Sequence, residues 1–186
     1  SSDLYVDGAT SATAAAWSVV LVQTDGTSTW FYGQLSGHVE LNPTSPWWIG
    51  ADTLDNIAAE FAAMLVAMRL AHSGLLTGNV LLRPDLRLSK HIAMQECSTT
   101  SNPLMAQIMR LYSQWLGRQL SVQEVRGHQH HPWNELADRL AKFALTTDSN
   151  PDVVPFLQPL HELATEATDA EWAWLQACPT SLLAAF

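Results

Sequence analysis

The stretch GHQHHPWNELAD, from Gly127 to Asp138, joins a histidine-bearing loop to a helix whose first turns carry carboxylates. In this helix Leu136, Leu140 and Phe143 recur at the spacing of one apolar stripe, so we expect them to be buried together. Asp138 lies at the edge of that stripe. A carboxylate held there is costly unless a cation compensates its charge. The stretch therefore indicates either a solvated helix face or, if other carboxylates converge on it, a polar site beside the core.

The composition is that of a globular domain. Of the 186 residues, 47% are hydrophobic and 15% are charged, and no uncharged run reaches the ~20 residues that span a bilayer. We therefore expect no membrane partner and an intracellular location, nuclear or cytoplasmic. Cys97 and Cys178 lack the spacing of a metal site and predict free thiols in a reducing compartment. The chain does not begin with Met, and we expect it to be a piece of a longer protein.

Positive charge is concentrated in the middle of the chain. The net charge is -9, but all nine Lys and Arg residues lie between Arg69 and Lys142, a segment with five acidic residues that therefore carries +4. Such a basic middle is typical of a nucleic-acid-binding surface, although ordinary solubilising charge would also explain it. The candidates for phosphate contacts are Arg83, Arg87, Lys90 and Arg126.

The pattern of apolar residues predicts an α/β domain. Strands are predicted at 4–8, 17–22, 28–33, 79–82 and 120–125, with a hairpin turn at 24–27. Helices are predicted at 53–71, 86–97, 104–116 and 134–143, the first of them capped by Asp52 or Thr53. This order predicts a mixed sheet whose first three strands form an antiparallel meander and whose later strands are reached by helical crossovers.

The ends of the predicted elements divide the chain near residue 145. Residues 1–145 form one predicted domain, and residues 146–186 are predicted as a linker followed by an acidic helical extension over 160–177. Within the domain, a Pro- and Gly-broken connection over 34–53 contains the pair Trp47-Trp48. Such a pair more often forms a hydrophobic lid over a sheet than a stacking platform for bases.

Four acids stand at informative positions in this order: Asp7 ending the first strand, Glu60 inside the first long helix, Asp85 after the fourth strand, and Asp138 in the last helix. Their surroundings are YVDGAT, then N-x-x-A-E from Asn56, then GH-(x)5-NE-x-AD over 127–138. In this combination and order the motifs resemble the ribonuclease H type 1 family over residues 4–145. The resemblance implies the ribonuclease H-like fold, an α/β fold with a five-stranded mixed sheet flanked by helices.

The resemblance also implies an activity, the endonucleolytic hydrolysis of the RNA strand of RNA-DNA hybrids by a two-metal-ion mechanism. Carboxylates without Cys suit hard cations such as Mg²⁺, with Mn²⁺ as a substitute, and two ions per site are implied. By resemblance, Asp7 and Asp85 hold the nucleophile-side ion. Asp7, Glu60 and Asp138 hold the leaving-group-side ion.

Two further residues take roles from the same resemblance. His128 would help protons or product leave, and Asn56 would contact the backbone of the hybrid in its minor groove, where the 2′-hydroxyl distinguishes RNA from DNA. The neighbouring His130 and His131 lack the second ligand pair of a zinc site and predict exposed loop histidines. Leu86 follows Asp85 where the family usually has a small hydroxyl residue.

Three kinds of protein remain open at this point. The resemblance favours the ribonuclease H module of a retroelement polyprotein, of the LINE (non-LTR) type, covalently linked to a reverse transcriptase domain. The alternative is a catalytically degenerate ribonuclease H-like domain that tethers or binds nucleic acid, which the presence of all four carboxylates disfavours. A third is another nuclease or integrase of the same fold, which the NELAD block disfavours.

Overall fold

A single mixed sheet organises the computed structural model, which describes residues 1–45, 47–94, 99–125, 131–147 and 150. Its strands are β1 (Ser2–Thr10), β2 (Ala15–Thr24), β3 (Thr29–His38), β4 (Val80–Pro84) and β5 (Leu120–Val122), in the order β3-β2-β1-β4-β5. The helices are α1 (Asn56–His72), α2 (Arg87–Ala93), α3 (Pro103–Leu116), the 3-10 helix η1 (Gly117–Gln119) and α4 (Pro132–Ala144). The first three strands are antiparallel, and β1, β4 and β5 run parallel, which confirms the predicted fold class.

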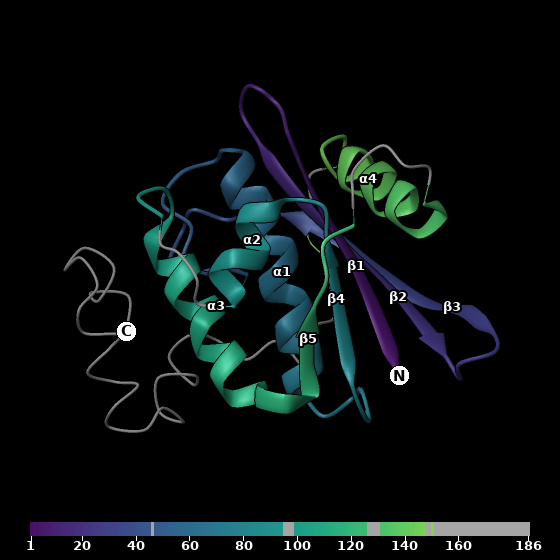
Figure 1. Ribbon diagram of the computed structural model, residues 1–186. Coiled ribbons are helices and arrows are strands. Elements are labelled where there is room, and N and C mark those ends of the chain that lie inside the picture. Colours follow the sequence, from purple (N-terminus) through teal and green to yellow (C-terminus); the bar gives the residue numbers. More distant parts are fainter. Residues whose placement is uncertain (46, 95–98, 126–130, 148–149, 151–186) are drawn as a thin grey trace.

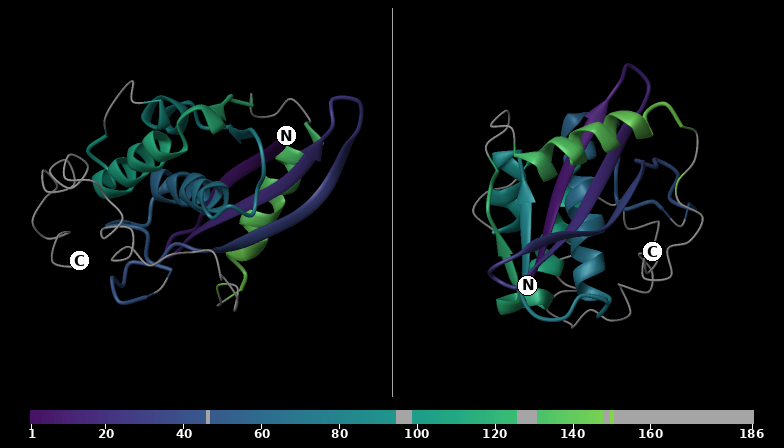
Figure 2. Two further views of the ribbon diagram at one scale, coloured as in Figure 1. Left: turned by 90° about the horizontal axis from the view of Figure 1, so that it is seen from below. Right: turned by 90° about the vertical axis from the view of Figure 1, so that its right-hand side faces the viewer.

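The helices cover the two faces of the sheet unequally. Figure 1 shows α1, α2 and α3 on one face and α4 alone on the other. In Figure 2, α4 runs across the strands on the side opposite α1. It packs against β1, β2 and β3, whereas the helices that β4 contacts are α1 and α2. No helix among the described residues is long and apolar enough to cross a membrane.

Helix α1 forms the centre of the larger core because it is buried on nearly every side. Its large apolar residues Phe61, Met64, Leu65 and Met68 are inaccessible, and alanines between them let both the sheet and α3 approach closely. The N-cap is Asp55, whose Oδ1 accepts a 2.7 Å hydrogen bond from the backbone N–H of Ala58. The predicted cap at residue 52 or 53 is therefore wrong by two to three residues.

Several strand ends differ from the prediction. β1 continues to Thr10 and β3 to His38, because β2 is long enough to pair with both along its whole length. The connection after β3 is correspondingly shorter than predicted. β5 ends at Val122, although the N–H groups of Gln123 and Val125 still donate to carbonyls of β4.

The predicted apolar stripe of α4 is wrong in part. Phe143 is 64% exposed, and Leu136 and Leu140 are only half-buried. The residues of α4 that are buried are Asn134, Ala137, Ala141 and Ala144. Periodicity gives most weight to large apolar side chains, whereas the fully buried apolar positions on this face are alanines, with Leu136 and Leu140 packed beside them only in part.

The Trp47-Trp48 pair belongs to the core, as the packing interpretation predicted. Trp48 is buried and donates from its indole N–H to the carbonyl of Ala51 at 3.0 Å. Trp47 stacks on Trp17 with ring centroids 5.6 Å apart. Both cysteines and the helix predicted at 160–177 lie outside the described residues, so the division near residue 145 stays a prediction.

Candidate active site

The register of the sheet places Asp7 and Asp85 side by side. Val6 of β1 pairs with Pro84 in the last pair of the β1–β4 ladder, so Asp7 and Asp85 are the next residues along two adjacent parallel strands. Such strands lie about 4.8 Å apart. Asp7 is therefore not at the end of β1, as predicted, but at the end of this ladder, and it is 4% exposed.

Glu60 reaches the same place because Gly8 lets α1 approach β1. A Cβ at Gly8 would lie 2.6 Å from the carbonyl carbon of Ala59 and from the backbone nitrogen of Glu60, closer than atoms can pack. The N–H of Gly8 donates to Asp7 Oδ1 at 2.8 Å and to Glu60 Oε1 at 3.3 Å. One backbone group therefore orients both carboxylates.

Together the three acids form a group suited to a cation. One carboxylate oxygen from each of Asp7, Glu60 and Asp85 lies within 4.8 Å of the other two. Glu60 Oε2 is buried and has no hydrogen-bond partner among the described residues. Oxygen ligands alone, without Cys or His, fit a hard divalent cation, which would also compensate the gathered charge.

The electrostatics of the group agree with this fit. Burial raises the pKa of Asp7 to about 7, and the charges of Asp85 and Asp138 add to the rise against the lowering effect of the Gly8 N–H. Burial, followed by the charges of Asp7 and Asp85, also raises the pKa of Glu60 well above its usual value. Without a cation the group therefore retains protons near neutral pH, and protons compete with metal for it.

Asp138, the fourth predicted acid, lies near this group but outside it. Its charge contributes to the raised pKa of Asp7, but its own Oδ2 accepts from Lys142 Nζ at 2.7 Å. The structure thus gathers three of the four predicted metal ligands and leaves Asp138 paired with a lysine one helical turn away. Mg²⁺ itself stays a prediction for all four.

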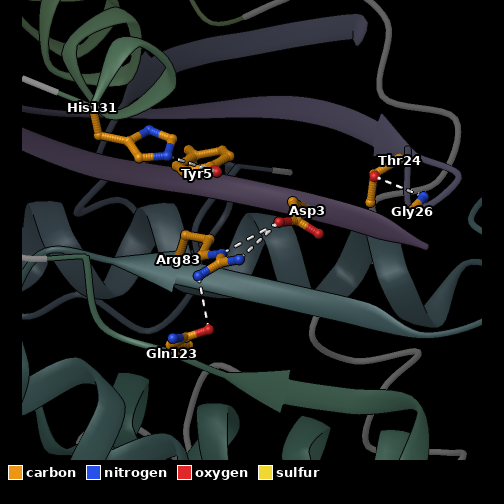
Figure 3. A network of polar contacts seen from close by, with 7 residues as sticks. All are labelled: Asp3, Tyr5, Thr24, Gly26, Arg83, Gln123 and His131. Carbon is orange, nitrogen blue, oxygen red and sulfur yellow. Dashed lines mark hydrogen bonds and ion pairs between the residues drawn. The ribbon is translucent and has the colours of Figure 1, made fainter. Parts of the chain in front are cut away.

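Arg83, a predicted phosphate contact, is engaged with neighbouring side chains. Its guanidinium donates to Asp3 Oδ2 at 3.1 Å and to Gln123 Oε1 at 2.8 Å (Figure 3). The same group lies 6.0 Å from the ring centroid of Tyr5. Sequence reasoning missed these contacts because their partners are 80 and 40 residues away from Arg83, with no local signal to connect them.

Tyr5 also anchors the start of α4. Its hydroxyl lies 3.3 Å from His131 Nε2, and the two rings stack with centroids 4.9 Å apart (Figure 3). His131 is half-buried, so the prediction of an exposed loop histidine is wrong for it, because the ring packs onto the sheet where α4 begins. His128, His130 and Arg126 lie outside the described residues.

The other predicted nucleic-acid contacts are distributed around the acids. Asn56, the exposed first residue of α1, accepts a hydrogen bond from the hydroxyl of Thr10. On α2, which begins two residues after Asp85, exposed Arg87 donates to His91 at 3.1 Å and Lys90 is half-buried. Their assignments to nucleic acid stay predictions.

Comparison with known proteins gives no match to a protein-family model or to a curated sequence. Solved structures do match. The ribonuclease H1 of the halophilic archaeon Halobacterium salinarum is 23% identical over 78% of this chain and 97% of its own, with a TM-score of 0.58. LC11-RNase H1, solved in complex with an RNA/DNA hybrid, is 18% identical over 78% of this chain and 99% of its own, with a TM-score of 0.54.

A third match comes from a larger protein. The protease-reverse transcriptase of prototype foamy virus is 19% identical over 80% of this chain, with a TM-score of 0.57, but the match covers only 21% of the viral chain. At these identities the likeness establishes the architecture alone. The described part of this chain has the fold of ribonuclease H domains.

Proposed function

We propose that this domain hydrolyses the RNA strand of RNA-DNA hybrids with divalent cations held by Asp7, Glu60, Asp85 and Asp138. The observation that carries the proposal is the group of three carboxylates within 4.8 Å, with a buried and unpartnered oxygen on Glu60. It stands on a fold shared with ribonucleases H, one of which was solved with an RNA/DNA hybrid. Gathered carboxylates with raised pKa values are typical of a functional site.

Each acid would hold the cations from a different part of the fold. Two bound divalent cations would activate a water molecule and neutralise charge on the leaving oxygen. Gly8 orients Asp7 and Glu60 toward each other, and the β1–β4 ladder delivers Asp85 beside them. Asp138 belongs to α4, which packs on the face of the sheet opposite α1 (Figure 1).

Other residues would hold the hybrid or release it. Asn56 would contact the backbone in the minor groove, and His128 would assist the departure of protons or product. Phosphates would be contacted by Arg83, Arg87, Lys90 and Arg126. For Arg83 this requires its guanidinium to exchange Asp3 or Gln123 for a phosphate oxygen.

We further propose that the domain works as a module of a retroelement polyprotein of the LINE type, covalently linked to a reverse transcriptase domain. The match to one part of a viral protease-reverse transcriptase supports such a linkage, since a domain of this fold is there joined to other modules in one chain. The basic segment between Arg69 and Lys142 would supply only part of the affinity for nucleic acid.

A cleavage assay tests the activity. The chain is incubated with an RNA-DNA hybrid, duplex RNA or duplex DNA, in Mg²⁺, Mn²⁺ or EDTA. We expect cleavage of the hybrid alone, dependent on metal, with 5′-phosphate and 3′-hydroxyl ends. Asp7→Asn should be inactive, and Asp52→Asn, at an exposed aspartate, serves as the matched control. Cyclic phosphate ends contradict the mechanism, and hybrid binding without cleavage indicates the degenerate tether instead.

A further inference from the structure

One buried hydroxyl connects the two sides of the candidate site. Ser18 of β2 is fully buried, at 0% exposure, and it pairs directly with Asp7 across the β1–β2 ladder. Its Oγ donates to the carbonyl oxygen of Ala137 at 2.6 Å, a contact between residues 119 positions apart. Ala137 immediately precedes Asp138 in α4. Ser18 therefore lies beside one predicted metal ligand and binds the backbone next to another.

The face of α4 that meets the sheet gives this bond its importance. Ala137, Ala141 and Ala144 are buried there, and their methyl groups permit a close approach, while the larger Trp133, Leu136 and Leu140 pack beside them only partly buried. Small, similar side chains interdigitate weakly, so they resist sliding or rotation of a helix less than large ones do. A hydrogen bond is directional and constrains both the axial position and the rotation of the helix.

The carbonyl of Ala137 does not need Ser18 for its own satisfaction. In a helix this oxygen accepts from the N–H four residues later, and a carbonyl has a second lone pair for a second donor. Removal of the hydroxyl therefore leaves no orphaned backbone group on α4. What it removes is the hydrogen bond that joins the helix, next to Asp138, to the strand pair that carries Asp7.

We propose that Ser18 is a positioning residue that sets the distance between Asp138 and the group formed by Asp7, Glu60 and Asp85. It would thereby determine the affinity of the cation that Asp138 helps to hold. The inference rests on the proposed function, because Asp138 pairs with Lys142 in this structure and becomes a ligand only when a cation is present. Ser18 itself contacts neither the cation nor the substrate.

Calorimetric titration of the full chain with Mn²⁺ tests the assignment. Ser18→Ala removes a single oxygen atom, and Ser89→Ala is the matched control. Ser89 is also fully buried, and its hydroxyl has no hydrogen-bond partner among the described residues. We expect the unaltered chain to bind two ions and Ser18→Ala to bind the ion assigned to Asp138 about threefold to tenfold less tightly, with the other ion unaffected. Ser89→Ala should change neither affinity.

A second pair of variants separates positioning from general destabilisation. In an Asp138→Asn background, Ser18→Ala should have no further effect on Mn²⁺ affinity, because the ligand through which it acts is gone. An equal loss of affinity in both backgrounds, or no loss in either, overturns the assignment. If the chain still cleaves hybrid and binds two ions after Ser18→Ala as before, only the role of Ser18 fails. A chain that binds no Mn²⁺ at all overturns both this role and the proposed function.

Discussion

Two polar groups close to the N-terminal half of α1 shift the pKa of a carboxyl group in opposite directions. At the cap, Asp55 accepts hydrogen bonds from the N–H of Ala58 at 2.7 Å, the hydroxyl of Ser101 at 2.6 Å and the amide of Asn102 at 3.2 Å. Burial acts to raise the pKa of Asp55, but these hydrogen bonds outweigh it and the pKa is lowered. Asp7 receives one N–H, from Gly8, and its pKa rises to about 7.

The two carboxylates differ in how many hydrogen-bond donors surround them. Asp55 has several, whereas Asp7 has the N–H of Gly8 among the described residues. The residues around Asp55 supply the donors that its charge requires, so this group stabilises the fold without help. The carboxylates of Asp7, Glu60 and Asp85 are gathered within 4.8 Å, and their mutual repulsion costs free energy that a bound cation would offset. Gathered carboxylates whose pKa values are raised are typical of a site that binds a ligand.

The largest expected contrast between the two groups is in catalysis. Asp7→Asn should lower the rate of hybrid cleavage by at least about a hundredfold, since it removes a ligand assigned to both cations. Asp55→Asn, a change of the same chemistry at the cap, should leave the rate of the folded protein within about twofold. Cleavage rates, with circular dichroism to establish the folded fraction, give the comparison. Equal losses in the two variants would show that the acids of the first group have no special role.

The second contrast concerns how closely α1 approaches β1. Gly8→Ala should lower the free energy of unfolding by about 2 to 3 kcal/mol, because its Cβ would meet the backbone of α1 at 2.6 Å. Gly33→Ala is the matched control in the same sheet, where an added Cβ meets nothing within 4 Å. Urea unfolding measures both. If Gly8→Ala is as stable as the control, α1 can withdraw at little cost, and Glu60 is not held tightly beside Asp7.

The third contrast is in the pH dependence of stability without metal. A carboxyl group whose folded-state pKa is raised binds protons more tightly when folded, so its contribution to stability falls as pH rises from about 4 to about 7. A group with a lowered pKa, such as Asp55, gives stability that is present above pH 4 and is lost as pH falls through its folded pKa. The two groups thus act in different pH ranges.

Asp7→Asn isolates the first of these ranges. In EDTA near pH 8 the variant should be more stable than the unaltered chain by about 1 kcal/mol, because one of the mutually repelling charges is removed. Toward pH 5 the difference should shrink. Mg²⁺ should stabilise the unaltered chain and stabilise the variant less. A variant that is less stable than the unaltered chain at pH 8 in EDTA, with no effect of Mg²⁺ on either, would contradict a cation site here.

Alternation and element order predicted the sheet and the elements that carry or precede Asp7, Glu60 and Asp85, although β1 continues past Asp7 to Thr10. The environment of Asp138 could not be predicted in the same way. It depends on which face of α4 meets the sheet, and apolar periodicity favoured the face of Phe143 over that of Ala137. Contacts between distant segments, such as those of Arg83, leave no periodic signal at all.

The smallest expected effect tests whether Asp138 exchanges Lys142 for a cation when the cation binds. Lys142 Nζ lies 2.7 Å from Asp138 Oδ2, but the two side chains are 65% and 35% exposed. Ion pairs of this kind contribute about 0.5 kcal/mol or less to stability. Lys142→Met should therefore barely change unfolding. Its effect should appear in the affinity for the Mn²⁺ ion assigned to Asp138, which should rise about twofold because the ion no longer competes with the lysine for Asp138.

Arg139→Met provides the control for this last comparison, since Arg139 is exposed and adjacent to Asp138 in sequence. It removes the same charge from the same turn of α4 without removing the ion pair. A similar gain in affinity from both variants would mean that Mn²⁺ responds only to the net charge of the helix. A gain confined to Lys142→Met would mean that the carboxylate of Asp138 has two alternative partners, a lysine in the free protein and a cation in the loaded one. Raising the salt concentration should then reduce the gain, because an exposed ion pair is screened.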